Sequence, residues 1–378
     1  MLKPAFVFGT RPEIIKLAPV IRAFERRGIE PLIVHTGQHY DYEMSKIFLE
    51  ELELHKIDYH LEVGSGTQAY QTGMAMIKIE EVLMKEKPDV TLVQGDTNTV
   101  LAGALASVKL KIPVAHVEAG LRSFDRTMPE EINRILADHA SEVLFAPTEE
   151  AKKNLEKEGI VEGVYVVGNT IVDAVLQNSE IAERKSRILE TLGLKPKEYA
   201  VLTAHRAENT DSEENLKKLV EIIGSLPIVV VYPVHPRTEK RLKALGLWEE
   251  LEAKEHVILT KPLGYLDFLK LQKNARFVLT DSGGIQEESI ILNVPCLTLR
   301  YNTERPETIK AGGNVLVGLE KDRVLYYVDK LLNDEEFYSR MANAKNPFGD
   351  GKAGERIAEI LIGLYEKGEL RVKSSRFI

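Results

Sequence analysis

Short runs of β-branched and aliphatic residues alternate along this chain with longer amphipathic runs. The short runs have the length of buried parallel strands, and the longer runs have helical periodicity. This alternation is typical of βαβ units, in which a parallel sheet carries helices on both faces. In the first half the sequence predicts strands at Pro4–Phe8, Pro31–His35, Val90–Gln94, Val114–Glu118, Glu142–Ala146 and Val164–Val167, and helices at Ile14–Arg27, Gln68–Lys87 and Thr99–Leu110.

The alternation breaks once, near the middle of the chain. From Ile171 to about Pro196 the sequence predicts one long helix and no strand. It then restarts, with strands predicted at Tyr199–Thr203, Ile228–Tyr232, Val257–Leu259, Phe277–Thr280, Cys296–Leu299 and Val315–Val317. We therefore expect an α/β fold with two Rossmann-like, doubly wound domains, residues 1–170 and 171–350, followed by a last helix at about 351–367.

Composition and charge exclude several classes of partner. The 378 residues carry a formal net charge of -8, which argues against a nucleic-acid-binding surface. Cys296 is the single cysteine, so no intrachain disulfide can form and a reducing compartment is expected. No segment reaches the roughly 18 consecutive apolar residues that indicate a membrane span. The sequence thus predicts a cytoplasmic protein without a nucleic-acid or membrane partner.

Unusual polar residues follow the predicted strands of the first half, where open α/β sheets bind their ligands. Arg11 and Lys16 lie near a helix start, where the dipole disfavours cations unless an anion binds; solvated side chains are the alternative. Asp96 either caps the next helix or takes part in catalysis. Glu118 ends a buried strand, where a carboxylate has no obvious structural reason to be. Glu131 lies in the first turn of a helix, a position that the dipole favours without any function.

The second half has its own strand-end clusters. His205 follows a strand beside Arg206, where structural and functional interpretations have similar weight. Ser282-Gly283-Gly284 connects a strand to a helix and predicts an anion site made of backbone N–H groups, with an ordinary tight turn as the alternative. Glu288, about one turn into that helix, could reach ribose hydroxyls, and Arg305 offers a further cation for a diphosphate.

The sequence lacks the motifs of several other kinds of chemistry. The chain has no Walker A loop, no Asp-x-Asp metal signature and no Gly-x-Ser-x-Gly nucleophile elbow. Gly64–Ala69 fits a dinucleotide fingerprint formally, but it does not follow the first strand of a βαβ unit. We therefore expect neither a metal nor a nicotinamide cofactor.

Taken in order, the clusters resemble the motifs of the non-hydrolysing UDP-N-acetylglucosamine 2-epimerases, including archaeal members. The resemblance runs from Gly9 to about Ile357 and rests on GTRPEIIK, QGDTNT, HVEAGLRS, PEEINR, FAPT, GNTIVD, TAHRAEN, TDSGGIQEE, TERPE and NPFGDGKAGERI. It implies a glycosyltransferase-B-like fold with a central cleft, a C-terminal helix, about 351–378, that returns to the first domain, and a homodimer without metal or cofactor. One departure is Arg300-Tyr301-Asn302, where family members often carry Arg-Asp.

The resemblance also assigns roles to residues. The carboxylates at the sugar would be Asp96, Glu118 and Glu131. The nucleotide and its diphosphate would be held by Arg11, Lys16, His205, Tyr265, Ser282, Gly283, Gly284, Glu288 and Arg305. Some relatives use UDP-GlcNAc as an activator at a second site, and Gln38 and His39 are the candidate contacts for such a ligand here.

The implied reaction interconverts UDP-GlcNAc and UDP-ManNAc. UDP would leave C1 while a base removes the C2 proton, and it would add back to 2-acetamidoglucal after protonation from the opposite face. In this scheme Asp96, Glu118 and Glu131 supply the acid and base groups, and His205 stabilises the departing UDP. Three alternatives stay open: the same chemistry on a UDP-diacetamido-uronate sugar, a glycosyltransferase of the same fold, and a nucleotide-sugar sensor without activity.

Overall fold

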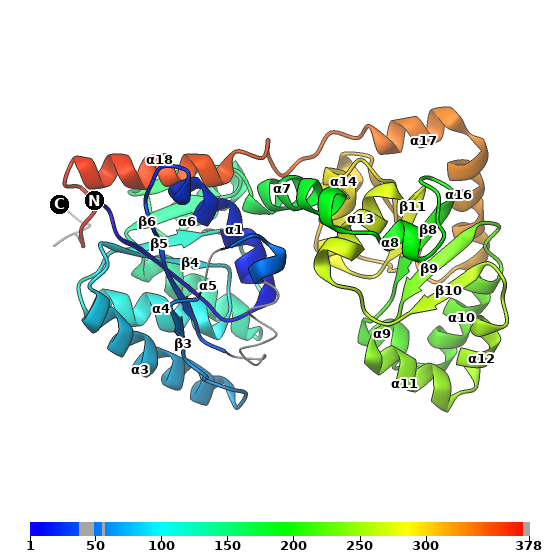
Figure 1. Ribbon diagram of the computed structural model, residues 1–378, viewed down its shortest axis with the longest axis horizontal. Coiled ribbons are helices and arrows are strands. Elements are labelled where there is room, and N and C mark those ends of the chain that lie inside the picture. Colours follow the sequence, from blue (N-terminus) through cyan, green and yellow to red (C-terminus); the bar gives the residue numbers. More distant parts are fainter. Residues whose placement is uncertain (38–48, 55–56, 373–378) are drawn as a thin grey trace. The chain divides into compact units, whose positions relative to one another are not determined.

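The computed structural model describes residues 1–37, 49–54 and 57–372 (Figure 1). The chain forms two compact units. Unit 1 comprises Met1–Ala174 together with Phe348–Ile378, and unit 2 comprises Val175–Pro347. Each unit is a parallel sheet with interleaved helices, which confirms the predicted class of two Rossmann-like α/β domains.

The sheet of unit 1 has seven parallel strands in the order β3-β2-β1-β4-β5-β6-β7. Their bounds are β1 Pro4–Phe8, β2 Leu32–His35, β3 Tyr59–His60, β4 Val90–Gln94, β5 Val114–Val117, β6 Val143–Ala146 and β7 Val164–Val166. β1 lies between β2 and β4, with Phe6 opposite Ile33 on one side and Leu92 on the other. The strand order therefore reverses between β1 and β4, the place where doubly wound sheets bind ligands.

Helices cover both faces of this sheet. They are α1 Arg11–Glu25, α3 Gln68–Glu86, α4 Asn98–Lys109, α5 Pro129–Ala140, α6 Glu149–Lys157 and α18 Ala353–Glu366. Figure 1 shows α1 and α18 on one face and α3 and α4 on the other. Because both faces are covered, β1 and β4 are buried along their whole length, which explains their continuous apolar sequences.

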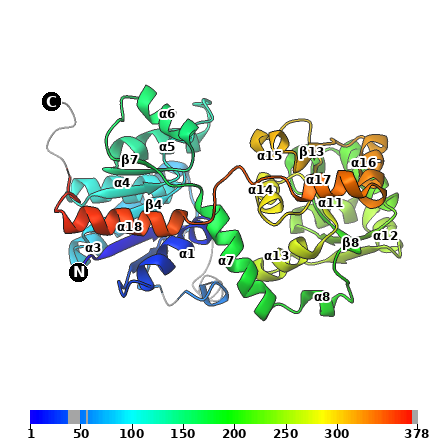
Figure 2. The same cartoon turned by 90° about the horizontal axis from the view of Figure 1, so that it is seen from above.

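The last helix, α18, packs along α1 (Figure 2). Glu355 of α18 forms ion pairs with Arg26 and Arg27 at the end of α1. Gly354 lies so close to α1 that an added Cβ would be 2.9 Å from the backbone of Pro19. Asp173 accepts hydrogen bonds from the amides of Ala353 and Gly354, at 3.2 and 2.8 Å, and so caps α18.

Unit 2 repeats the same topology with six parallel strands in the order β10-β9-β8-β11-β12-β13. The strands are β8 Tyr199–Thr203, β9 Val229–Pro233, β10 Val257–Thr260, β11 Phe277–Thr280, β12 Cys296–Thr298 and β13 Asn314–Leu316. The helices are α8 Ile188–Thr191, α9 Ala207–Thr210, α10 Glu213–Gly224, α11 Pro236–Ala244, α12 Leu247–Glu252, α13 Tyr265–Asn274, α14 Gly283–Ile291, α15 Pro306–Lys310, α16 Lys321–Asn333 and α17 Glu335–Ala342. Here the strand order reverses between β8 and β11.

One predicted element is wrong. The long helix expected from Ile171 to about Pro196 is divided into α7, Thr170–Lys185, and the short α8. Ser186 lies at the break, where its hydroxyl donates to Asp267 Oδ1 at 2.5 Å and accepts from the amide of Ile188 at 3.3 Å. These bonds offer the backbone an alternative to the helical pattern, and the one to Asp267 depends on the tertiary fold. Within the described residues no helix is long and apolar enough to cross a membrane.

Candidate active site

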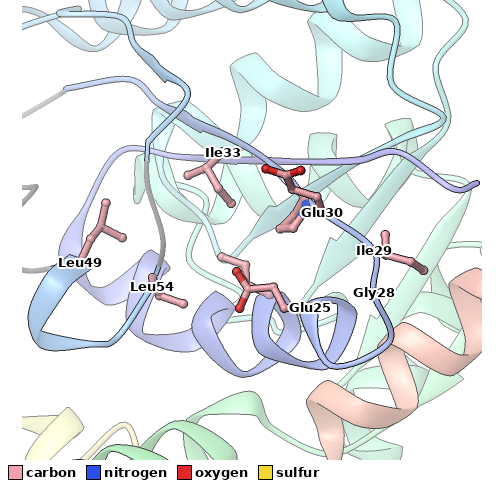
Figure 3. A pocket seen from close by; sticks show the side chains of 9 residues that line it. Glu25, Gly28, Ile29, Glu30, Ile33, Leu49 and Leu54 are labelled. Carbon is pink, nitrogen blue, oxygen red and sulfur yellow. The ribbon is translucent and has the colours of Figure 1, made fainter.

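A mainly apolar hollow in unit 1 lies away from the strand-end clusters (Figure 3). Its lining comes from the end of α1, the loop before β2 and nearby leucines: Ile21, Glu25, Gly28, Ile29, Glu30, Pro31, Ile33, Leu49 and Leu54. The end of α1 and the start of β2 are at the amino end of the strands. The polar residues that the sequence singles out lie at the opposite, carboxyl end.

Glu13, which was not predicted from the sequence as a site residue, connects the loop after β1 with the loop after β4. Its Oε2 accepts from the amides of Gly9 and Thr10, at 3.0 and 2.7 Å, and from the Thr10 hydroxyl at 2.7 Å. Its Oε1 accepts from the Thr97 hydroxyl at 2.8 Å. Burial raises the pKa of Glu13 to about 7 against the lowering effect of these donors. The Thr10-x-x-Glu13 spacing of a capping box was the sequence signal for this role.

Glu118 lies directly after β5, buried and 7% exposed. Its φ of 68° is left-handed, a conformation that costs a residue with a side chain about 1–2 kcal/mol. Lys16 of α1 donates to its Oε1 at 2.6 Å, and the side-chain amide Nε2 of Gln94 donates to its Oε2. Backbone strain of this kind is common at functional sites. The structure thus pairs Lys16, which the resemblance assigns to the diphosphate, with a carboxylate assigned to the sugar.

Asp96 and Glu131 are joined by Arg134, a residue of α5 that lies in the PEEINR motif. Arg134 forms ion pairs with Asp96 and, at 3.0 Å, with Glu131. Glu131 also accepts from the amides of Ser123 and Phe124, both at 2.9 Å. Burial acts to raise the pKa of Glu131, but these donors outweigh it and hold the pKa below its usual value. Glu131 is therefore an ionised group whose oxygens are occupied by the loop after β5.

In unit 2, Asp281 brings the loops after β8 and β11 together. This buried carboxylate accepts from the amides of His205 and Arg206, each at 2.9 Å, and pairs with His205 Nδ1 at 3.3 Å. Burial opposes ionisation, yet the bonds from His205 and Arg206 lower the pKa of Asp281. With Nδ1 directed at Asp281, the imidazole, which is 41% exposed, keeps Nε2 for another partner. His205 was predicted from the sequence, but Asp281 was not, although it stands in the TDSGG motif.

Ser282, Gly283 and Gly284 form the start of α14, next to Asp281. Ser282 occupies the N-cap position, and the first helical hydrogen bond runs from the Gln286 amide to the Ser282 carbonyl at 3.2 Å. The N–H groups of the helix start therefore have no acceptor within the helix, as at every helix N-terminus. An added Cβ on Gly284 would contact only Ser282 Oγ, at 4.0 Å. This open backbone is the geometry that anion binding requires.

Acidic and basic side chains flank this loop. Burial, with a smaller contribution from Glu287, raises the pKa of Glu288 to about 8. Arg305 donates to Glu287 at 2.6 Å. Arg300, at the departure from the family pattern, is buried and bridges Glu208 and Glu304 at 2.6 and 2.8 Å. It therefore fixes the segment that leads to Arg305.

The remaining predicted residues are at strand ends or outside the described ranges. Arg11 is the first residue of α1, and Tyr265 is the first residue of α13, after β10. Gln38 and His39, the predicted contacts of an activator, lie outside the described residues. Among the residues that the structure describes, no group of three or more His, Cys, Asp or Glu side chains could hold a metal ion.

Comparison with known proteins places this geometry in a family. A family model described as UDP-N-acetylglucosamine 2-epimerase matches residues 22–362. The UDP-N-acetylglucosamine 2-epimerase of Methanocaldococcus jannaschii is 55% identical over 367 residues, which cover 95% of this chain and 99% of that protein. The crystal structure of the M. jannaschii enzyme in complex with UDP-GlcNAc and UDP matches with a TM-score of 0.80 at 55% identity and covers 96% of this chain and 100% of that one.

A further relative differs in its printed substrate. The UDP-2,3-diacetamido-2,3-dideoxy-D-glucuronate 2-epimerase of Pseudomonas aeruginosa is 42% identical over 368 residues, covering 96% of this chain and 100% of that protein. The matches extend through both units. Every strand-end cluster except the one after β1, which includes Arg11 and Lys16, lies within the residues that the family model matches. The chain therefore belongs to the UDP-N-acetylglucosamine 2-epimerase family, whose members are isomerases.

Proposed function

We propose that this chain interconverts UDP-GlcNAc and UDP-ManNAc by eliminating UDP and adding it back. The observation that carries the proposal is the set of carboxylates at the carboxyl ends of β4 and β5, Asp96 and Glu118, in a chain 55% identical to an enzyme of that name. Inverting C2 needs a base for a weakly acidic C–H, and these groups are of the right chemical class.

The proposed elimination breaks one C–H bond and one C–O bond. A carboxylate takes the C2 proton, the C–H electron pair becomes the C1–C2 double bond, and the C1–O bond breaks with its electrons going to UDP. In the reverse direction UDP oxygen bonds to C1 while a carboxylic acid protonates C2 from the other face. Glu118 and Asp96 are the proposed proton carriers. Glu131, whose oxygens are bonded to backbone amides, is proposed to hold the loop after β5 in place.

Unit 2 is proposed to bind UDP and to stabilise it as it leaves. The backbone amides of Gly283 and Gly284 would donate hydrogen bonds to the diphosphate. His205, oriented by Asp281, would donate from Nε2 to the leaving oxygen. Glu288 would bind the ribose, with Arg11, Tyr265 and Arg305 as further contacts. Lys16, now paired with Glu118, would balance the charge of whichever anion is present.

Epimerisation in D₂O tests this mechanism. If C2 is deprotonated, UDP-ManNAc formed from UDP-GlcNAc carries deuterium at C2, which NMR and mass spectrometry detect. Glu118→Gln and Asp96→Asn should lower exchange and interconversion together by about 10²–10⁴-fold. Glu130→Gln, an exposed neighbour of Glu131 in the same helix turn, is the matched control and should retain activity. Product with protium fully retained at C2 would rule the mechanism out.

The same chemistry on a UDP-diacetamido-uronate sugar is a second candidate, because the P. aeruginosa relative carries that name at 42% identity. Offering both UDP-sugars and comparing kcat/KM decides between them. UDP released only when a sugar acceptor is added would instead favour a glycosyltransferase.

The proposal also includes a cytoplasmic homodimer and an activating UDP-GlcNAc contacted by Gln38 and His39. Sedimentation equilibrium tests the dimer, which a fully active monomer would contradict. Sigmoidal dependence on UDP-GlcNAc, lost in Gln38→Ala and His39→Ala, is the expected sign of activation, and hyperbolic kinetics would count against it.

A further inference from the structure

The interior of unit 1 contains a histidine that the proposed reaction does not use directly. His116 of β5 is fully buried, and so is Asp138 of α5. Its Nδ1 lies 2.6 Å from Asp138 Oδ1, and its Nε2 lies 2.8 Å from the carbonyl oxygen of Gly95. A carbonyl oxygen can only accept, so Nε2 must carry a proton.

The protonation of Nδ1 then depends on Asp138. Either Asp138 is ionised and accepts from an imidazolium, or it is protonated and donates to a neutral ring. The other oxygen of Asp138 accepts from the amide of Gly120 at 3.1 Å and pairs with the guanidinium of Arg122 at 2.8 Å. Both donors favour the carboxylate, so the ring carries two protons and a positive charge.

The other cation at Asp138 is paired with a second carboxylate. Arg122 is itself paired with Glu158 at 2.7 Å, and His139 is 3.5 Å from the same carboxylate. Burial alone would lower the pKa of His116, but Asp138, the Gly95 carbonyl and Glu118 together raise it above its usual value.

The contacts of the pair connect the two turns that carry the proposed proton carriers. Gly95, whose φ of 86° is left-handed, immediately precedes Asp96, and its carbonyl is bound by His116. Gly120 closes the turn that begins at Glu118, and its amide is bound by Asp138. We infer that His116 is a permanent imidazolium that, with Asp138, positions Asp96 and Glu118 relative to each other. The positional half of this inference rests on the proposed function.

The protonation state can be measured without substrate. We expect ¹⁵N spectra of histidine-labelled protein to show both ring nitrogens of His116 protonated at the ordinary histidine pKa of about 6.5 and above it, with the signal assigned by its loss in His116→Gln. In Asp138→Asn the same ring should become neutral within that range. A wild-type His116 that titrates near the ordinary value of about 6.5, or that is a neutral tautomer at pH 7, would overturn the inference.

Kinetics test the positioning. His116→Gln and Asp138→Asn should each lower kcat by about 10²-fold, the effect of small misplacement of catalytic groups, while the Kd for UDP is unchanged. His256→Gln, a half-buried histidine of unit 2 bonded to the Ile223 carbonyl at 3.1 Å, is the matched control. A rise in KM with normal kcat would contradict positioning.

The failure of this inference can be distinguished from the failure of the proposed function. If the wild type has the imidazolium but incorporates no deuterium at C2, only the proposed function fails. If deuterium is incorporated but His116 is neutral, only this inference fails.

Discussion

Gly284→Ala should make the protein more stable and UDP binding weaker. Gly284 is the second residue of α14, it is not left-handed, and its added Cβ would contact only Ser282 Oγ at 4.0 Å. Alanine in a helix is more favourable than glycine by about 0.5–1 kcal/mol, so the free energy of unfolding of unit 2 should rise. The methyl group would occupy the open space over the backbone where the diphosphate is proposed to lie.

The loss of affinity follows from the contacts that the methyl group prevents. One hydrogen bond to a charged group contributes about 1.5–3 kcal/mol. Losing one backbone N–H contact to the diphosphate should therefore weaken UDP binding by about 10- to 100-fold. Isothermal titration calorimetry gives the Kd, and chemical denaturation followed by circular dichroism gives the stability. The opposite signs of the two changes separate loss of the ligand site from damage to the fold.

Gly363→Ala in α18 is the matched control, because its added Cβ meets nothing within 4 Å. It should raise stability and leave the Kd for UDP unchanged. Wild-type UDP affinity in a well-folded Gly284→Ala variant would refute the backbone anion site. Loss of stability in that variant would refute the open geometry at the start of α14.

Three further predictions follow from particular contacts. His205→Asn should lower kcat by about 10²–10³-fold with an unchanged circular dichroism spectrum, since it would remove the proposed donor to the leaving group, and near-normal turnover would make His205 structural. Glu288 has a pKa of about 8 when folded against 4.5 ordinarily, so folding is penalised as pH rises from about 4.5 to 8. Glu288→Gln should thus gain stability over wild type through that range in urea titrations, and a pH-independent difference would contradict the burial effect. Gly354→Ala should lose about 1–3 kcal/mol because its Cβ would be 2.9 Å from the Pro19 backbone, whereas Gly363→Ala on the same helix should not; equal melting temperatures would disprove close packing of α18 on α1.

The sequence was informative about the fold because buried parallel strands require apolar runs of limited length. Each predicted strand, for example Pro4–Phe8 and Tyr199–Thr203, has a counterpart in the two sheets. The helix predicted over Ile171–Pro196 was wrong because its break at Ser186 depends on Asp267, which lies 81 residues away. Local periodicity contains no information about such a partner.

The positions of the candidate site residues after strands were predictable from the sequence, but their hydrogen bonds and ion pairs were not. Parallel strands bring their carboxyl ends to one edge, so Asp96, Glu118, His205 and Ser282 could be selected from their positions after strands. Glu13 and Asp281 were missed, because each looked like an ordinary residue of a helix start or a tight turn. Both proved to be buried carboxylates that join two loops.

The sequence by itself therefore determined the fold class, the family and the edge of each sheet where polar residues gather. Only the tertiary structure decided which charges meet there. Lys16 and Glu118 are 102 positions apart and form an ion pair at 2.6 Å. His116 looks like a residue within an apolar strand until α5 places Asp138 against it. The physical reason is that periodicity reflects burial, which each segment encodes locally, whereas hydrogen bonds and ion pairs depend on distances of a few ångströms set by the packing of separate segments.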